Sequence, residues 1–300
     1  MTNTRHIVVA INPTAHSGRG GAIGARVVSR LETAGYRVDP LSADSASALR
    51  ERIQKSLLDD STLVVVGGDG MVSLAANLLA FSQPALALVP AGTGNDFARG
   101  MGFPVDDIDA CIELTMASLE RAPKHVDLAE VTGSHGTRMV AGVVSAGFDA
   151  LVNERANQMR FPRGHSKYTF AIFRELLGLR PREYSLTVDG VSSRIQAVLV
   201  SIANNSYMGG GMWVSPSSSI SDGSLEVFEV GPVSRRRLVR LLPSVFKGGH
   251  VNEPEVRITG VCAARLDSAG VIAYADGERI GPLPIEVSVR PGALRLHTLD

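Results

Sequence analysis

Residues 63–79 read LVVVGGDGMVSLAANLL, and this stretch decides the fold. The consecutive apolar residues 63–66 predict a strand buried on both faces, as in parallel sheets. Residues 71–79 have the apolar spacing of a helix. Between them, the glycine-rich loop places Asp69 at the carboxyl end of a parallel strand, where open α/β sheets bind ligands. A tight turn without a binding role is the alternative for this loop alone.

The same alternation of strand and helix extends to both sides of this stretch. It predicts a parallel sheet with helices on both faces, an α/β domain. The predicted strands are 6–12, 36–41, 62–66 and 85–89, and the predicted helices are 22–34, 45–58 and 71–79.

The second half of the chain predicts antiparallel strands instead. Asp189-Gly190 stands between two alternating runs, which is typical of a type I′ hairpin. We therefore expect an α/β domain over 1–130, to which the C-terminal strand can return, and a β-rich sandwich over 131–300 with helical inserts near 150–178 and 234–246. The predicted strands are 125–131, 138–145, 184–188, 195–202, 225–230, 255–258, 261–266, 271–274 and 285–290.

Composition excludes several classes of protein. The chain has 300 residues, 44% of them hydrophobic, with 30 basic and 30 acidic side chains, which rules out disorder, collagen and coiled coil. Two cysteines cannot build a disulfide framework, so we expect a reducing, cytoplasmic setting. No apolar run approaches the roughly 20 residues that span a bilayer. The net charge is −4 over 1–130 and +4 over 131–300, where basic residues gather at 155–182 and 235–247.

Two more loops follow strands of the predicted sheet. Residues 12–21 read NPTAHSGRGG and residues 90–99 read PAGTGNDFAR, with Asp96 expected to be a helix N-cap. The first loop matches neither a Walker A nor a Rossmann glycine pattern. Each loop alone is equally compatible with a simple connection, but three of them at one sheet edge favour a phosphate and metal site.

These loops resemble the diacylglycerol kinase catalytic-domain superfamily, which includes bacterial lipid kinases and sphingosine kinases, with NAD kinases and phosphofructokinases as distant relatives. The resemblance continues through VDL (126–128), AGFDA (146–150), NNSYMGGGM (204–212), DGSL (222–225) and YADGE (274–278). It implies an ATP- and Mg²⁺-dependent kinase that phosphorylates a lipid hydroxyl, on diacylglycerol or on a relative such as a sphingoid base.

The resemblance also implies roles for individual residues. Asp276 and Glu278 lie on the segment that supplies the general base, and Asp69 acts beside them in catalysis. A structural Mg²⁺ is implied at Asp222 with Ser219 and Ser224, although Asp-Gly at 222 and at 276 is also what a hairpin turn would use. The implied ATP ligands are Asn12, Gly18, Gly68, Asp69, Gly92, Thr93, Asn95 and Glu278, and Asp69, Asp96 and Asp127 are expected to organise the catalytic Mg²⁺ largely through water.

The sequence departs from the family pattern at two positions. Met71 and Ser73 stand where relatives usually have Thr and Asn, so a hydroxyl near the nucleotide is lost unless Thr93 or Ser73 replaces it. There are two alternative functions: an NAD kinase, and a catalytically weak regulator that binds nucleotide or lipid. We expect a lipid substrate at a membrane surface and peripheral contact with anionic lipid at the inner face of the membrane. We expect no nucleic-acid partner, and a homodimer is compatible with the sequence.

Overall fold

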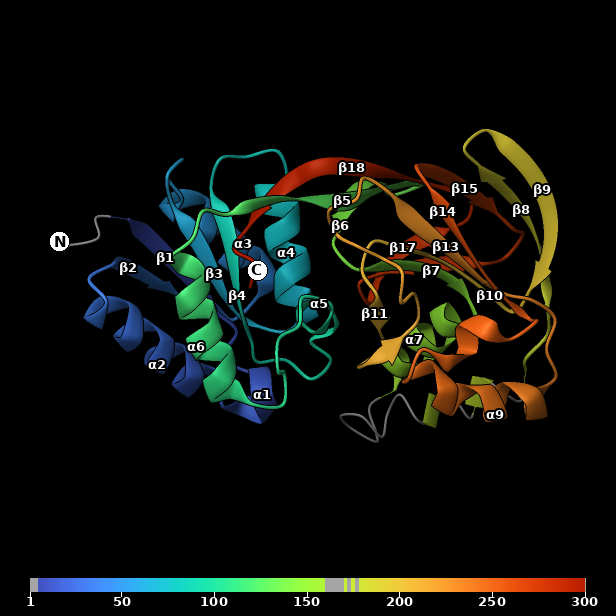
Figure 1. Cartoon of the computed structure of the whole chain (residues 1–300), viewed down its shortest axis with the longest axis horizontal. Helices are drawn as coiled ribbons and strands as arrows, with labels where there is room; N and C mark the ends of the chain where they lie inside the picture. Colours follow the sequence, from blue (N-terminus) through green and yellow to red (C-terminus); the bar gives the residue numbers. More distant parts are fainter. Residues whose placement is uncertain (1–4, 160–169, 172–173, 176–177, 300) are drawn as a thin grey trace. The chain divides into compact units, whose positions relative to one another are not determined.

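The structure is a computed structural model that describes residues 5–159, 170–171, 174–175 and 178–299. The chain forms two compact units (Figure 1). The first contains residues 1–128 and 291–300, and the second contains residues 129–290. Residues 291–300 belong to the first unit; the predicted boundaries gave them to the sandwich but allowed the C-terminal strand to return to the α/β domain.

The first unit is built on a parallel sheet in the order β2-β1-β3-β4. Every residue of β1, β3 and β4 is buried, so the uninterrupted apolar runs of the sequence are strands covered on both faces. Their bounds are His6–Ile11 (β1), Arg37–Leu41 (β2), Thr62–Gly67 (β3) and Ala85–Pro90 (β4). The predicted α/β fold is confirmed.

Helices cover both faces of this sheet (Figure 1). Helices α2 (Gly20–Thr33) and α6 (Ile108–Leu119) pack on the face that carries Val9, Val64 and Val89. Helices α3 (Ala46–Ser56) and α4 (Asp69–Leu79) contact the sheet from the other side. The short α1 (Ala15–Gly18) and α5 (Asp96–Gly100) follow β1 and β4. Helix α6 was not predicted, although Asp107 caps it with bonds of 3.0 Å from the N–H groups of Asp109 and Ala110.

The second unit has two antiparallel layers that enclose one core. One layer has the order β14-β13-β10-β7-β16-β17, and the other contains β15, β8, β9 and β6 with parts of β5 and β18. Apolar residues of both layers, among them Val144, Ile202 and Leu266, form that core. The strands are β5 (Lys124–Gly133), β6 (Gly136–Val140), β7 (Val143–Gly147), β8 (Arg182–Val188), β9 (Val191–Ala197), β10 (Leu199–Ala203), β13 (Leu225–Val230), β14 (Val256–Val261), β15 (Ala263–Asp267), β16 (Ile272–Ala275), β17 (Glu278–Pro282) and β18 (Ile285–Leu296).

Two strands predicted as continuous are each split between the layers. The run 138–145 becomes β6 and β7, because the N–H groups at 141–143 bond to the carboxylate of Asp276 and not to a neighbouring strand. The run 195–202 becomes β9 and β10, and between them the Val198 N–H bonds to the carbonyl of Val230. The pattern of apolar residues shows the strands but not the point where the chain changes layer.

The second unit also contains helices and a small hairpin. They are α7 (Phe148–Gln158), a small hairpin of β11 (Tyr207–Met208) and β12 (Met212–Trp213), α9 (Arg235–Val245) and the 3-10 helix η1 (Gly249–Asn252). Most of the predicted insert beyond residue 159 lies outside the described residues. In the part of the chain that is described, no helix has the length and apolar character needed to cross a bilayer.

Candidate functional site

Loops from three strands of the first unit meet at one edge of its sheet. The Asn12 N–H donates to the carbonyl of Val66 at 3.1 Å, and the Ala91 N–H donates to the carbonyl of Gly67 at 2.8 Å. The carboxyl ends of β1, β3 and β4 are therefore held together by the main chain itself. This is the edge at which α/β sheets bind ligands.

Gly68 and Gly92 bring two of these loops into backbone contact. A Cβ added to Gly92 would lie 2.3 Å from the Cα of Gly68, and one added to Gly68 would lie 2.8 Å from the Cα of Gly92. Both distances are shorter than real carbon contacts, so only glycine allows this approach. Gly70 differs, because no atom lies within 4 Å of the Cβ position there and the start of α4 is open.

Asp69 joins the same two loops through its side chain. Its Oδ1 accepts a hydrogen bond from the Phe97 N–H in the first turn of α5, at 3.1 Å. The residue is half-buried in the first turn of α4, where the helix dipole favours negative charge. Its second oxygen accepts no hydrogen bond from the described residues, so it is available to a cation or a hydrated ligand.

The loop after β4 uses Asn95 to hold its own shape. The Asn95 Oδ1 accepts from the Gly92 N–H at 2.8 Å, and its Nδ2 donates to the Gly92 carbonyl at 3.2 Å. The buried Asn95 therefore shapes the loop, and exposed Thr93 is the side chain that a ligand could reach. The predicted N-cap was wrong by one position, because Asn95, with φ of 54°, is the cap and Asp96 begins α5.

The loop after β1 is more ordered than its glycines suggested. Asn12 Oδ1 accepts from the Thr14 N–H at 3.1 Å and from the Thr14 hydroxyl at 2.8 Å, and α1 follows. Gly18 has a φ of +90°, which favours glycine whether or not a ligand is bound. The structure thus assigns Asn12 to the turn, and leaves ATP contact by Asn12 and Gly18 as a prediction.

Met71 and Ser73, the two departures from the family pattern, are both buried. The Cγ of Met71 lies 2.5 Å from where a Cβ at Gly67 would stand, so the methionine packs directly beneath the loop. Thr93 is therefore better exposed than Ser73 to replace the missing hydroxyl.

Asp127 lies on β5 with 4% of its surface exposed. Its Oδ1 accepts from the Gly292 N–H of β18 at 2.8 Å, which fastens the last strand. Within the described ranges, no three His, Cys, Asp or Glu side chains gather closely enough to hold a metal. Direct coordination by Asp69, Asp96 and Asp127 together is thus not built into the fold, and their action through water remains a prediction.

Asp276 has a defined position in the second unit. It occupies the two-residue turn between β16 and β17, with φ of 48° at Asp276 and 79° at Gly277, both positive as in a type I′ turn. Its carboxylate accepts from the N–H groups of Ala141, Gly142 and Val143 at 3.1 to 3.2 Å. Glu278 is exposed and forms an ion pair of 2.5 Å with Arg138.

At the predicted structural Mg²⁺ site Asp222 lies in a local turn, and metal binding there stays a prediction. The Asp222 Oδ1 accepts from the Ser224 N–H at 3.0 Å and from the Ser224 hydroxyl at 3.1 Å, whereas Ser219 contacts Ser221. Sequence reasoning missed Glu226, a buried carboxylate that accepts from the Ser218 hydroxyl at 2.5 Å. Burial raises its pKa, and the charge of Asp222 adds to that shift.

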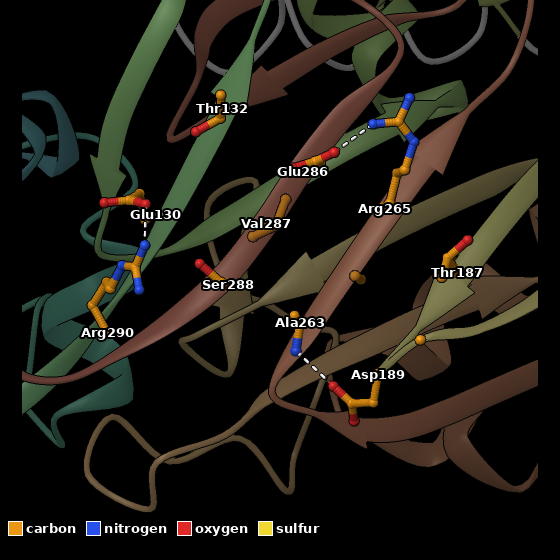
Figure 2. Close-up of a pocket in the computed structure, with 12 residues that line it drawn as sticks. Glu130, Thr132, Thr187, Asp189, Ala263, Arg265, Glu286, Val287, Ser288 and Arg290 are labelled. Carbon is orange, nitrogen blue, oxygen red and sulfur yellow. Dashed lines mark hydrogen bonds and ion pairs between the residues drawn. The ribbon is translucent and has the colours of Figure 1, made fainter.

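The two described cavities differ in size and in chemistry. A void of about 10 Å³ lies beneath the loops, between Asp69 and Asn95, which is room for a single water. A groove of about 260 Å³ lies in the second unit (Figure 2). Its charges are already paired, Arg290 with Glu130 and Arg265 with Glu286, and Asp189 bonds to the Ala263 N–H. The arginine and glutamate charges of the groove therefore neutralise one another, and Asp189 is held by main-chain N–H groups.

Comparison with known proteins covers nearly the whole chain. Residues 6–131 match the diacylglycerol kinase catalytic domain, and residues 142–298 match the YegS C-terminal NAD kinase beta sandwich-like domain. A diacylglycerol kinase of Mycobacterium tuberculosis is 35% identical over 93% of this chain and 91% of its own length. A diacylglycerol kinase of Bacillus subtilis is 26% identical over 87% and 86%. A crystal structure of a diacylglycerol kinase from Bacillus anthracis has the same fold, with a TM-score of 0.70, 20% identity, and coverage of 98% of this chain and 96% of that one.

Proposed function

The chain belongs to the diacylglycerol kinase family of lipid kinases, and from this premise we propose that it transfers the γ-phosphoryl group of ATP to the hydroxyl of diacylglycerol or a closely related lipid, with Mg²⁺. The observation that carries the proposal is the meeting of three loops at the carboxyl ends of β1, β3 and β4. It combines open space at Gly70 with an oxygen of Asp69 that accepts no hydrogen bond from the described residues. Helix N-termini and exposed main-chain N–H groups favour phosphate.

Asp69 is the residue best placed to organise the phosphates. One oxygen fixes the carboxylate to α5, and the other faces no described hydrogen-bond partner. A carboxylate held in this way suits a hydrated Mg²⁺, which keeps several waters and takes few protein ligands. When bound, Mg²⁺ would neutralise charge that develops on the transferring phosphoryl group.

The turn at 276–278 is proposed to supply the general base. In the reaction, the lipid oxygen forms a bond to the γ-phosphorus as the bond to ADP breaks, and a carboxylate accepts the hydroxyl proton. Three main-chain donors hold the carboxylate of Asp276 in one orientation, which favours presentation of an oxygen to a bound hydroxyl. Glu278 is held by Arg138 and is proposed to contact the nucleotide.

The proposal is tested by incubating the purified protein with ATP labelled in its γ-phosphate and a panel of lipids in mixed micelles. We expect label in phosphatidic acid, or in another phosphorylated lipid of the panel, and its loss when EDTA removes divalent cations. Transfer to NAD with none to lipid would establish the NAD kinase alternative. ATP binding by calorimetry without turnover on any lipid would identify a regulator.

A further inference from the structure

Helix α9 presents a solvent face on which basic and apolar side chains are combined. Four cations on or just after this helix are exposed, Arg235, Arg236, Arg240 and Lys247. Val239 is 45% exposed and Phe246 is 53% exposed. By helical spacing, 235, 239 and 246 form one stripe and 236, 240 and 247 the next, so the six side chains share one face.

The opposite side of α9 is fixed to the protein. Leu238 and Leu241 are buried there, and Leu238 packs with Phe148 and Val152 of α7. Ser234 caps the helix by accepting from the Arg237 N–H at 3.3 Å. The cations and apolar groups of the exposed face are therefore not needed to hold α9 on the protein.

In the described part of the chain, the acidic side chains near α9 form ion pairs with Arg237 and not with the four exposed cations. Arg237 points away from the exposed stripes and forms ion pairs with Glu253 and with Glu255. No ion pair joins the four exposed cations to any described residue. The basic cluster predicted from the sequence thus loses Arg237 and gains two apolar neighbours, Val239 and Phe246.

The same combination continues beyond the end of the helix. The 3-10 helix η1 contacts α9, and its Val251 is 37% exposed. A solvated helix face normally carries charges of both signs and few large apolar groups. Cations beside exposed valine and phenylalanine are instead the composition of helices that lie in a membrane interface.

We propose that this face of α9 docks the protein on an anionic bilayer, with Val239 and Phe246 entering the headgroup boundary and the cations binding lipid phosphates. The inference rests on the proposed function only in that the substrate is a lipid. A second copy of the chain is a poor occupant, because the same four cations would face each other. An anionic surface complements both features of the face at once.

The test is sedimentation with vesicles of phosphatidylcholine containing about one third phosphatidylglycerol, without ATP. Two variants remove the two features separately: Arg236→Gln with Arg240→Gln, and Phe246→Gln. The controls are Arg50→Gln, on the exposed surface of α3, and Phe81→Gln, which is 66% exposed in the first unit.

We expect the double arginine variant to lower partitioning about thirty-fold at low salt, which corresponds to about 1 kcal/mol for each basic side chain. Phe246→Gln should lower it about ten-fold, from the loss of buried apolar area. The controls should bind like the wild-type protein. Wild-type binding should weaken as NaCl rises to about 0.5 M, because salt screens surface charge.

Wild-type protein that ignores anionic vesicles, or α9 variants that bind as well as the controls, would overturn the inference. Retention by DNA without vesicle binding would do the same and would assign the face to nucleic acid. Turnover of a short-chain, water-soluble diacylglycerol separates the two proposals. Docking variants should retain that turnover, whereas its absence in the wild-type protein contradicts the proposed substrate and leaves the vesicle result unaffected.

Discussion

Replacing Asp69 by Asn should abolish phosphoryl transfer while leaving the fold intact. The side chain has two separable roles. Its Oδ1 accepts from the Phe97 N–H in the first turn of α5 at 3.1 Å, and its other oxygen is proposed to organise the metal and phosphates. Asn can keep the first contact through its own oxygen, but it places an NH₂ donor where the second oxygen stood. Removing one preorganised charge contact costs about a hundred-fold or more in kcat.

The stability cost of the same change should be small. Loss of a negative charge in the first turn of α4 costs roughly 0.3 to 1 kcal/mol. Asp69→Ala also removes the acceptor of the Phe97 N–H in the first turn of α5 and should cost about 1 kcal/mol more. Thermal denaturation should therefore rank the proteins as wild type, then Asn, then Ala, with differences of a few degrees.

Asp107→Asn is the matched control for this experiment. Asp107 caps α6 in the same unit through the N–H groups of Asp109 and Ala110. Its substitution should change stability by a similar amount and leave labelled phosphate transfer unchanged. If Asp69→Asn kept more than about a tenth of wild-type kcat, the expected hundred-fold loss would be absent and the role of Asp69 refuted. If it lost activity only together with its melting transition, the loss would belong to the fold.

Three further predictions concern other parts of the chain. Asp276→Asn should lower kcat, and it should lower the free energy of unfolding in urea by about 2 to 3 kcal/mol. The reason is that an amide cannot accept from the N–H groups of both Ala141 and Gly142 as the carboxylate does. Unchanged stability would contradict the structural role of these hydrogen bonds. Gly92→Ala should raise the KM for ATP and destabilise the folded protein by about 1 to 3 kcal/mol, because the added Cβ would lie 2.3 Å from the Gly68 Cα. A variant with normal KM would show that the two loops can separate at no cost to ATP binding. Burial lowers the pKa of His250 and of His297 below the usual 6.5, so the unfolded chain binds protons that the folded chain excludes. The melting temperature should therefore fall as the pH drops below about 6.5. His250→Gln should make the melting temperature depend less on pH in this range.

Local patterns were sufficient to predict most of the fold. Apolar runs such as 63–66 are strands because a parallel sheet buried on both faces needs them. Asp189-Gly190 is the predicted hairpin, with φ of 45° and 86°, because its signal lies within two residues.

What the sequence could not reveal depends on distant partners or on one backbone angle. The break between β6 and β7 is made by Asp276, more than 130 residues away. The ion pairs of Arg237 come from glutamates 16 and 18 residues along the chain. Asn95 displaces Asp96 as cap only because it adopts a left-handed conformation. The three loops were predicted to converge, but the positioning roles of Asn95 and Asp127 required the structure.

The return of β18 to the first unit constrains the order in which the protein can be completed during synthesis. Its end pairs with β4 at Leu86, where the His297 N–H also donates to the carbonyl, and the Phe81 N–H donates to Ala293. Until residues 291–297 have left the ribosome, the outer edge of β4 has no partner from that strand, and open strand edges are prone to mispairing. The first unit to be translated is thus the last to be closed, and any nucleotide bound by its loops would reach a finished sheet only after the whole sandwich has emerged.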